Sequence, residues 1–418
     1  MIALFAAAAI FLLVDPFKFF APSMKPARMP LNQGIAKTIG VAIQKEARPA
    51  KKAVLDLFDS HQLVLVGDYG FIREEDEFFN SLIPNLGSVS VSAVGVDFLL
   101  STDQPAIDAL IANPAFDEKQ ARQLIIHRDP FRSNRQQLEI IKTVWAVNHP
   151  DPIAQTAAPT SLRLLGLSVD WDVALFAAQQ QNQRDPVVLK KVFRNGLPDE
   201  AIAKTLEAEV LAKNIKAIAL VNRESVFTGF VEPNYESTQK IYGIGDTRRS
   251  GRILADSYGQ AVCAVTFHVP WKDPRNQTGV TWPVSGQIDG AMGTLANGTI
   301  PAFPFALDLS SPSFSRLPIA DSDYIQARPF KVKDKEFPAG PKQDRFLGEF
   351  GALYIVLNQI SDLHPSDPIP DLITEQNKAD AARFLAAQNP SRDKPAEMNK
   401  MIVQKFENLR GFFSQFRQ

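Results

Sequence analysis

Acidic residues stand at the ends of the apolar runs in this sequence, where they could carry chemistry. Asp68 follows the run at 63–66, and Asp97 lies near the end of the run at 91–98. Polar residues follow three later runs in the same way: Asp170-Trp171-Asp172, Asn222-Arg223-Glu224-Ser225 and His268. Carboxylates gathered in one place suit a divalent cation or general acid–base catalysis, although a single one is more often a helix cap.

The apolar runs alternate with segments of helical periodicity, and this alternation predicts an α/β fold. We expect strands at 63–66, 91–98, 162–167, 216–221 and 261–267, and helices at 74–83, 104–112, 117–127, 134–148 and 199–213. Continuous apolar strands separated by helices indicate a largely parallel central sheet flanked by helices. Ligand sites of such sheets lie beyond the carboxyl ends of the strands, so the polar residues above are expected to meet in an acidic pocket.

Composition excludes several classes of protein. The chain has 418 residues, of which 45 are basic and 46 acidic, and the resulting net charge of −1 argues against nucleic acid as a partner. The single cysteine, Cys263, rules out an internal disulfide and a zinc site built on cysteines. Because it lies within an apolar run, we expect a buried, unreactive thiol.

The amino-terminal residues 1–21 form an apolar anchor or signal-like segment. The uninterrupted apolar stretch at 2–14 is short for a membrane span, which needs about 20 residues, and resembles the core of a signal peptide. No basic residue precedes it, whereas Lys18, Lys25 and Arg28 follow it, which favours a cytoplasmic body. Membrane attachment is therefore predicted with its side left open, the periplasmic side being slightly favoured.

Two further segments flank the predicted domain. Residues 22–54 are expected to be a linker and a leading helix, with helical periodicity from 35 to 58. Residues 366–418 are expected to be a helical extension that places Ile402, Phe406 and Phe416 on one face. Such a basic, phenylalanine-rich helix can lie on a membrane, dock on a protein partner or pack on its own domain, and all three alternatives stay open.

Between residues 55 and 365 the sequence resembles the erythromycin esterase and ChaN-like haem-binding superfamily. The resemblance rests on distributed segments: Leu63-Val64-Leu65-Val66-Gly67-Asp68 before an acidic helix, Val94-Gly95-Val96-Asp97, the stretch from Leu162 to Asp172, and His268-Val269-Pro270-Trp271. It implies a single α/β domain and either hydrolysis of an ester or amide, or binding of haem.

The departures from this pattern concern the histidines. Gly70 or Phe71 stands where the first histidine belongs and Ser225 where the second belongs, so that only His268 matches. Histidine supplies a metal ligand or a base near neutral pH, and neither glycine nor phenylalanine does. Two sets of residues follow from the resemblance: Asp68, Asp97 and His268 as vestigial catalytic residues, and Tyr69, Arg73, Glu224 and Ser225 as ligand-binding residues.

These observations favour a non-catalytic pseudoenzyme, a membrane-associated binding or scaffold subunit with a protein partner and no cofactor. One alternative is an ester or amide hydrolase in which Asp68, Asp97 and Glu224 surround a divalent metal and His268 is the base. The other is a haem or tetrapyrrole protein with Tyr69 as the axial oxygen ligand. In the favoured reading no metal site is expected.

Overall fold

The computed structural model describes residues 33–150, 161–178, 185–272, 280–295, 300–319, 330–332, 335–337, 340, 343–385, 394–409 and 413–416. The predicted apolar segment at 1–21 and the linker up to residue 32 lie outside this range. Within it, no helix combines the length and the apolar content that a membrane span requires.

The described residues form an eight-stranded sheet in the order β1-β9-β12-β6-β2-β5-β3-β4. Its strands, in chain order, are β1 (Arg48–Pro49), β2 (Leu63–Asp68), β3 (Val91–Leu100), β4 (Arg163–Ser168), β5 (Lys216–Asn222), β6 (Val262–Phe267), β9 (Phe305–Asp308) and β12 (Leu353–Val356). Neighbours from β12 through β4 run parallel, while β9 is antiparallel to both β12 and β1. The predicted α/β fold with a largely parallel sheet is confirmed.

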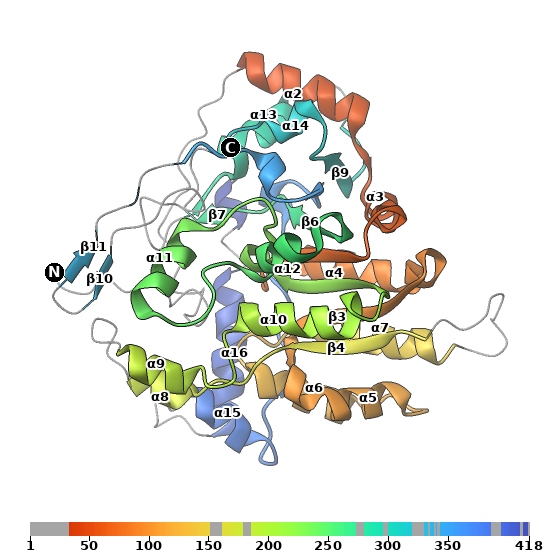
Figure 1. The fold of residues 1–418 in the computed structure, drawn as a ribbon. Coiled ribbons are helices and arrows are strands. Elements are labelled where there is room, and N and C mark those ends of the chain that lie inside the picture. The colour runs from red at the N-terminus through yellow and green to blue at the C-terminus, as the bar shows by residue number, and fades with distance from the viewer. Residues whose placement is uncertain are drawn as a thin grey trace.

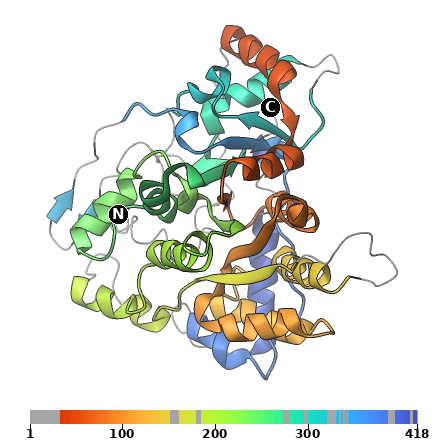
Figure 2. The same cartoon turned by 45° about the vertical axis from the view of Figure 1, so that its right-hand side comes forward.

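Helices cover both faces of this sheet (Figures 1 and 2). They are α2 (Gln33–Glu46), α3 (Ala50–Asp56), α4 (Arg73–Leu82), α5 (Gln104–Ala112), α6 (Glu118–Arg128), α7 (Arg135–Asn148), α8 (Val173–Ala178), α9 (Pro186–Val192), α10 (Pro198–Leu206), α11 (Pro233–Tyr242), α12 (Ser250–Tyr258), α13 (Gln287–Thr294), α14 (Pro312–Ser315), α15 (Lys378–Leu385) and α16 (Pro395–Leu409). Two small antiparallel pairs complete the described elements: β7 (Trp271–Lys272) with β8 (Val280–Thr281), and β10 (Phe330–Val332) with β11 (Lys335–Phe337).

The strands are apolar throughout because each of their two faces packs into a separate core. In β2, Leu63 and Leu65 face the core beneath α2, α10, α12 and α13, whereas Val64 and Val66 face the core beneath α4, α5, α6 and α7. Alternate residues of a strand point to opposite faces of the sheet. Because helices cover both faces here, both sets of residues are buried, and the strand sequences are apolar without alternation. Cys263 of β6 is buried in the second of these cores, as expected.

The carboxyl-terminal helices pack on the α4–α7 face of the domain. Met398, Ile402 and Phe406 of α16 are buried there, as are Phe413 and Phe416 of the short turn that follows. The apolar face predicted for this extension therefore lies against its own domain, and the membrane- or partner-facing alternatives are wrong for these residues. The domain boundary predicted at 365/366 stays a prediction.

The single helix predicted from 35 to 58 is wrong, because the chain breaks between α2 and α3. Arg48 and Pro49 extend there and pair with Ala306 and Phe305 of β9. Proline lacks the amide hydrogen that a helix interior needs and drives the residue before it toward extended backbone. The predicted helix at 199–213 likewise ends its α-helical part at Leu206 and continues as a π-helical turn over Glu207–Leu211.

Candidate functional site

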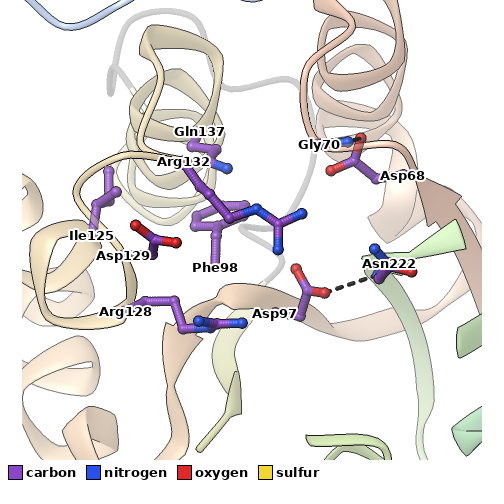
Figure 3. Close-up of a pocket in the computed structure, with 10 residues that line it drawn as sticks. All are labelled: Asp68, Gly70, Asp97, Phe98, Ile125, Arg128, Asp129, Arg132, Gln137 and Asn222. Carbon is purple, nitrogen blue, oxygen red and sulfur yellow. Dashed lines mark hydrogen bonds between the residues drawn. The ribbon is translucent and has the colours of Figure 1, made fainter. Parts of the chain in front are cut away.

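A small cavity lies beyond the carboxyl ends of β2, β3 and β5 (Figure 3). Its volume is about 30 Å³, enough for roughly two water molecules or one small polar group. It is lined by Asp68, Gly70, Asp97, Phe98, Ile125, Arg128, Asp129, Arg132, Gln137 and Asn222. The predicted convergence of Asp68 and Asp97 is therefore present, and two arginines join them.

Asp68 is the last residue of β2, and its carboxylate is buried against the turn that follows. The Gly70 amide donates a hydrogen bond to Asp68 Oδ1 at 2.5 Å, and the φ of +82° at Gly70 is one that glycine adopts without strain. Burial raises the pKa of Asp68 to about 6, against lowering contributions from the hydrogen bonds with Glu75 and Gly70. Asp68 therefore changes charge close to neutral pH.

Two further acids, Glu75 and Asp76, lie buried behind Asp68 in the first turn of α4. The Tyr69 amide donates to Glu75 Oε2 at 2.9 Å. Burial, and next the charge of Asp68, raise the pKa of both carboxyls well above their usual range. The sequence contained a signal for them that we missed, because Glu75 lies four and seven residues before Phe79 and Leu82, which are also buried.

Asp97, near the end of β3, forms the floor of the cavity. Its carboxylate accepts a hydrogen bond from the Asn222 amide of β5 at 2.8 Å. Burial raises its pKa, while the positive charges of Arg128 and Arg132 act in the opposite direction. Figure 3 shows both arginine side chains extending toward Asp97, one from the last residue of α6 and one from the loop before α7. Sequence reasoning missed these arginines because only strand ends were searched.

His268 does not line the cavity, which corrects its predicted grouping with Asp68 and Asp97. Its ring is fully buried between β6, β12 and α13, where Nδ1 lies 3.1 Å from the Tyr354 hydroxyl and Nε2 lies 3.1 Å from Asp289 Oδ1. Both ring nitrogens thus have partners in the core. The imidazole is therefore held within the core, away from the cavity that Asp68 and Asp97 line.

None of the four residues predicted to bind a ligand lines the cavity. The Tyr69 ring is covered by the Arg223 guanidinium group at 4.4 Å. Arg73 forms an ion pair with Asp367 at 2.7 Å. Glu224 and Ser225 are buried in the turn that follows β5, next to a network of ion pairs. A role for these four residues in binding ligand therefore stays a prediction without support from the geometry of this cavity.

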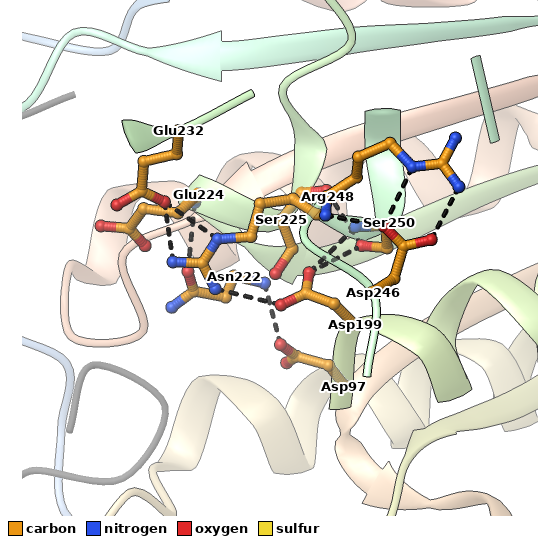
Figure 4. A network of polar contacts seen from close by, with 10 residues as sticks. Asp97, Asp199, Asn222, Glu224, Ser225, Glu232, Asp246, Arg248 and Ser250 are labelled. Carbon is orange, nitrogen blue, oxygen red and sulfur yellow. Dashed lines mark hydrogen bonds and ion pairs between the residues drawn. The ribbon is translucent and has the colours of Figure 1, made fainter. Parts of the chain in front are cut away.

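That network is centred on Arg249, the residue before α12 (Figure 4). Its guanidinium group donates to Glu232 Oε2 at 2.9 and 2.8 Å and to Asp199 Oδ2 at 3.0 Å, and it lies 3.9 Å from the centre of the Tyr235 ring. The hydroxyl of Ser250 donates to the Ser225 carbonyl at 2.9 Å. The guanidinium group of Arg249 and the hydroxyl of Ser250 thus have internal partners, and the network joins α10, α11 and α12; the buried hydroxyl of Tyr235 has no hydrogen-bond partner among the described residues.

The cofactors of the two alternative hypotheses fit the described residues poorly. No three His, Cys, Asp or Glu side chains are grouped there so as to hold a metal ion. A cavity of about 30 Å³ is far too small for a porphyrin, and Tyr69, the predicted axial ligand, lies under Arg223 and outside the cavity wall. Neither a metal ion nor haem therefore fits the Asp68 cavity.

Comparison with solved structures finds relatives in fold. The chain is similar to a succinoglycan biosynthesis protein (TM-score 0.51, 10% identity, 81% of this chain and 100% of that chain). It is also similar to an erythromycin esterase mutant in its open conformation (TM-score 0.43, 12% identity, 73% and 92%). A third is ChaN of Campylobacter jejuni with cofacial haem (TM-score 0.34, 12% identity, 52% and 84%).

ChaN and an erythromycin esterase, the two proteins named in the resemblance of the sequence, are both among these structures. No protein-family model and no curated protein matches the chain. Identities of 10–12% show likeness of fold alone, and activity has to be argued from the site.

Proposed function

We propose that this protein binds a small polar ligand in the cavity between Asp68, Asp97, Arg128 and Arg132, and that it does not carry out histidine-dependent hydrolysis. One observation carries the proposal: charged side chains from three separate segments meet at the carboxyl edge of a parallel sheet, where ligands of such folds bind. The described cavity wall contains no imidazole, and His268 is engaged in the core.

A binding role also fits the chemical character of the wall. Carboxylates and guanidinium groups face the same small space, so a ligand with both donors and acceptors can be oriented by fixed charges. The backbone supports this arrangement, since amides of Gly70 and Asn222 hold Asp68 and Asp97 in place. Such preorganised groups bind without the cost of ordering flexible side chains.

The proposal is tested by thermal denaturation of the protein against a panel of small polar metabolites. Ligands that raise the melting temperature are then titrated into Asp97→Asn, which keeps the volume of the side chain and removes its charge. We expect at least one ligand whose affinity falls about tenfold or more in the variant, as loss of one charge-assisted hydrogen bond implies. If no ligand depends on Asp97, the proposal is wrong.

Acid–base catalysis by Asp68 is a second candidate, favoured by the pKa of about 6 that burial gives this carboxyl. A group of this pKa exchanges protons efficiently near neutral pH. Activity toward activated esters that rises with pH through about 6, and is lost in Asp68→Asn, would support it. Activity that Asp68→Asn retains would exclude Asp68 as the base.

We also propose, from the sequence of residues 1–21 alone, attachment to a membrane, with the periplasmic side favoured and with a protein partner bound there. Support comes from the apolar run at 2–14. Fractionation of cells expressing the full chain and a variant lacking residues 2–21 tests attachment, and protease accessibility tests the side. Purification in mild detergent with mass spectrometry tests the partner. A full chain recovered alone in the soluble fraction would contradict all three.

A further inference from the structure

Arg128 and Arg132 differ from the other half-buried and buried arginines discussed above, because no hydrogen bond or ion pair joins their guanidinium groups to another described residue; Arg132 lies 5.4 Å from the centre of the Phe71 ring. Within the described residues, neither group donates a hydrogen bond or lies within 4.0 Å of a carboxylate oxygen, and Nε of Arg128 is buried without an acceptor. By contrast, Arg249 donates to two carboxylates, and Arg248 binds both Asp246 and Asp256.

The guanidinium groups of Arg128 and Arg132 both extend toward Asp97 (Figure 3), and the charge of Arg132 acts on Arg128. Burial is the main reason that the pKa of Arg128 is lowered, and the positive charge of Arg132 is the next. Two like charges that face one cavity repel each other, and the carboxylate of Asp97 attracts both of them across that cavity. An anion between the two guanidinium groups relieves their repulsion, because guanidinium groups donate paired, charge-assisted hydrogen bonds to carboxylate and phosphate oxygens.

The acids of the cavity do not replace such an anion. Asp97 accepts its hydrogen bond from the Asn222 amide and Asp68 from the Gly70 amide, and Asp129 accepts from the Phe131 amide at 2.9 Å. Burial raises the pKa of Asp68 and Asp97, so a nearby anion favours their protonated forms. A protonated carboxyl is itself a donor to an oxyanion.

We propose that Arg128 and Arg132 form a subsite for the oxyanion of the ligand, a carboxylate or phosphate group, which lies between the two guanidinium groups above Asp97. This inference rests on the proposed function and names the chemical class of its ligand. The cavity of about 30 Å³ has room for the anionic group only. The remainder of the ligand extends past the arginines, both of which are partly exposed to solvent.

The test uses inorganic phosphate and acetate as separate probes, titrated into the full-length protein by calorimetry at constant ionic strength set with chloride. We expect at least one probe to bind. Arg128→Gln and Arg132→Gln should each weaken that binding about tenfold or more, the loss of one charged hydrogen bond. Arg135→Gln is the matched control, because Arg135 is exposed at the start of α7 and outside the cavity, and its affinity should stay within about twofold of the parent.

A second measurement needs no variant and so does not depend on how the variants fold. Phenylglyoxal modifies accessible arginines, and peptide mass spectrometry identifies which ones. The bound probe should slow modification of Arg128 and Arg132 and leave that of Arg135 unchanged.

Two results overturn the inference: neither probe binds, or binding is equal in the parent and both cavity variants. If a neutral polar ligand still binds in an Asp97-dependent way, the proposed function stands and only the oxyanion subsite falls. If no ligand depends on Asp97, the proposed function itself has failed.

Discussion

Replacing Arg249 with methionine would remove the guanidinium group that Asp199 and Glu232 share. Both carboxylates are buried, with exposed fractions of 0% and 4%, and Arg249 supplies three of the hydrogen bonds that hold them. Ser250 continues to donate to Asp199 through its amide at 3.0 Å, which compensates only part of the loss. Removing one partner from a buried ion pair costs about 3–5 kcal/mol, a large part of the 5–15 kcal/mol that typically stabilises a domain.

Equilibrium unfolding in urea at pH 7 measures this cost. Arg248→Met is the matched control, because Arg248 is the preceding residue and forms ion pairs with Asp246 and Asp256 that are about one-third exposed. Exposed pairs contribute about 0–1 kcal/mol, so the control should lose no more than that. The triple variant with Asp199→Asn and Glu232→Gln should regain part of the loss, since it leaves no uncompensated buried charge.

The cost should also depend on pH in a defined direction. Without Arg249, the folded state holds two buried carboxylates without their shared cation, and protonation relieves this cost in the folded state but not in the unfolded state. The Arg249→Met variant should therefore gain stability relative to the parent as the pH is lowered from 7 to 5. A loss below about 1 kcal/mol at pH 7, or a loss that does not change with pH, would refute the reasoning.

Further predictions concern single side chains. The pKa of Asp68 rises from 3.8 to about 6 in the folded protein. In urea unfolding, the parent should therefore lose about 2–3 kcal/mol of stability relative to Asp68→Asn as the pH rises from 4 to 7. A difference in stability that does not change with pH would contradict the raised pKa. Phe406→Ala should cost about 3–5 kcal/mol, because this ring is buried and lies 6.4 Å from Phe71; a cost near zero would mean that α16 is not docked. Asp103 raises the pKa of His127, with Oδ2 at 2.8 Å from Nδ1. This interaction stabilises the folded protein by about 1 kcal/mol or less at pH 6, and the stabilisation is lost as the pH rises through the raised pKa of His127. In urea unfolding, His127→Gln should therefore be as stable as the parent at pH 9. A loss of stability in His127→Gln that is larger at pH 9 than at pH 6 would contradict the raised pKa. Burial raises the pKa of the Cys263 thiol, so a thiol reagent should react with it only when the protein unfolds; rapid reaction in the folded state would place it at the surface.

Most of the central sheet could be predicted from the sequence, because short continuous apolar runs between helical segments are typical of buried strands of a parallel sheet. All five strands expected from the sequence are present, and the helix expected at 104–112 has those bounds. The short strands β1, β9 and β12 were not predicted, since two to four residues carry almost no periodicity. The pairing of β1 with β9 depends on a contact between Arg48 and Ala306, which are far apart in the chain.

The candidate site was only partly predictable. Asp68 and Asp97 were found because strand ends follow a rule of position. Arg128 and Arg132 come from the end of one helix and from the following loop. A basic residue in such a place usually interacts with the carbonyl end of the helix or with solvent, and so it gives no signal of a ligand site. His268 was misassigned because a residue just after a strand can point along the sheet edge or into the layer beside it. The sequence does not tell these directions apart, and here Tyr354 and Asp289 draw the ring into the core.

The packing of α16 also bears on how the protein matures during synthesis. Phe406 packs against Phe71, and the residue before Phe71, Gly70, lines the cavity. The carbonyl of Phe71 accepts a hydrogen bond from the Ser366 amide at 2.9 Å. The strands that carry Asp68 and Asp97 leave the ribosome long before residues 366–406 are translated. The apolar face over α4–α7 on which α16 packs therefore stays uncovered until late in translation, and this exposed apolar surface is prone to aggregation during that interval.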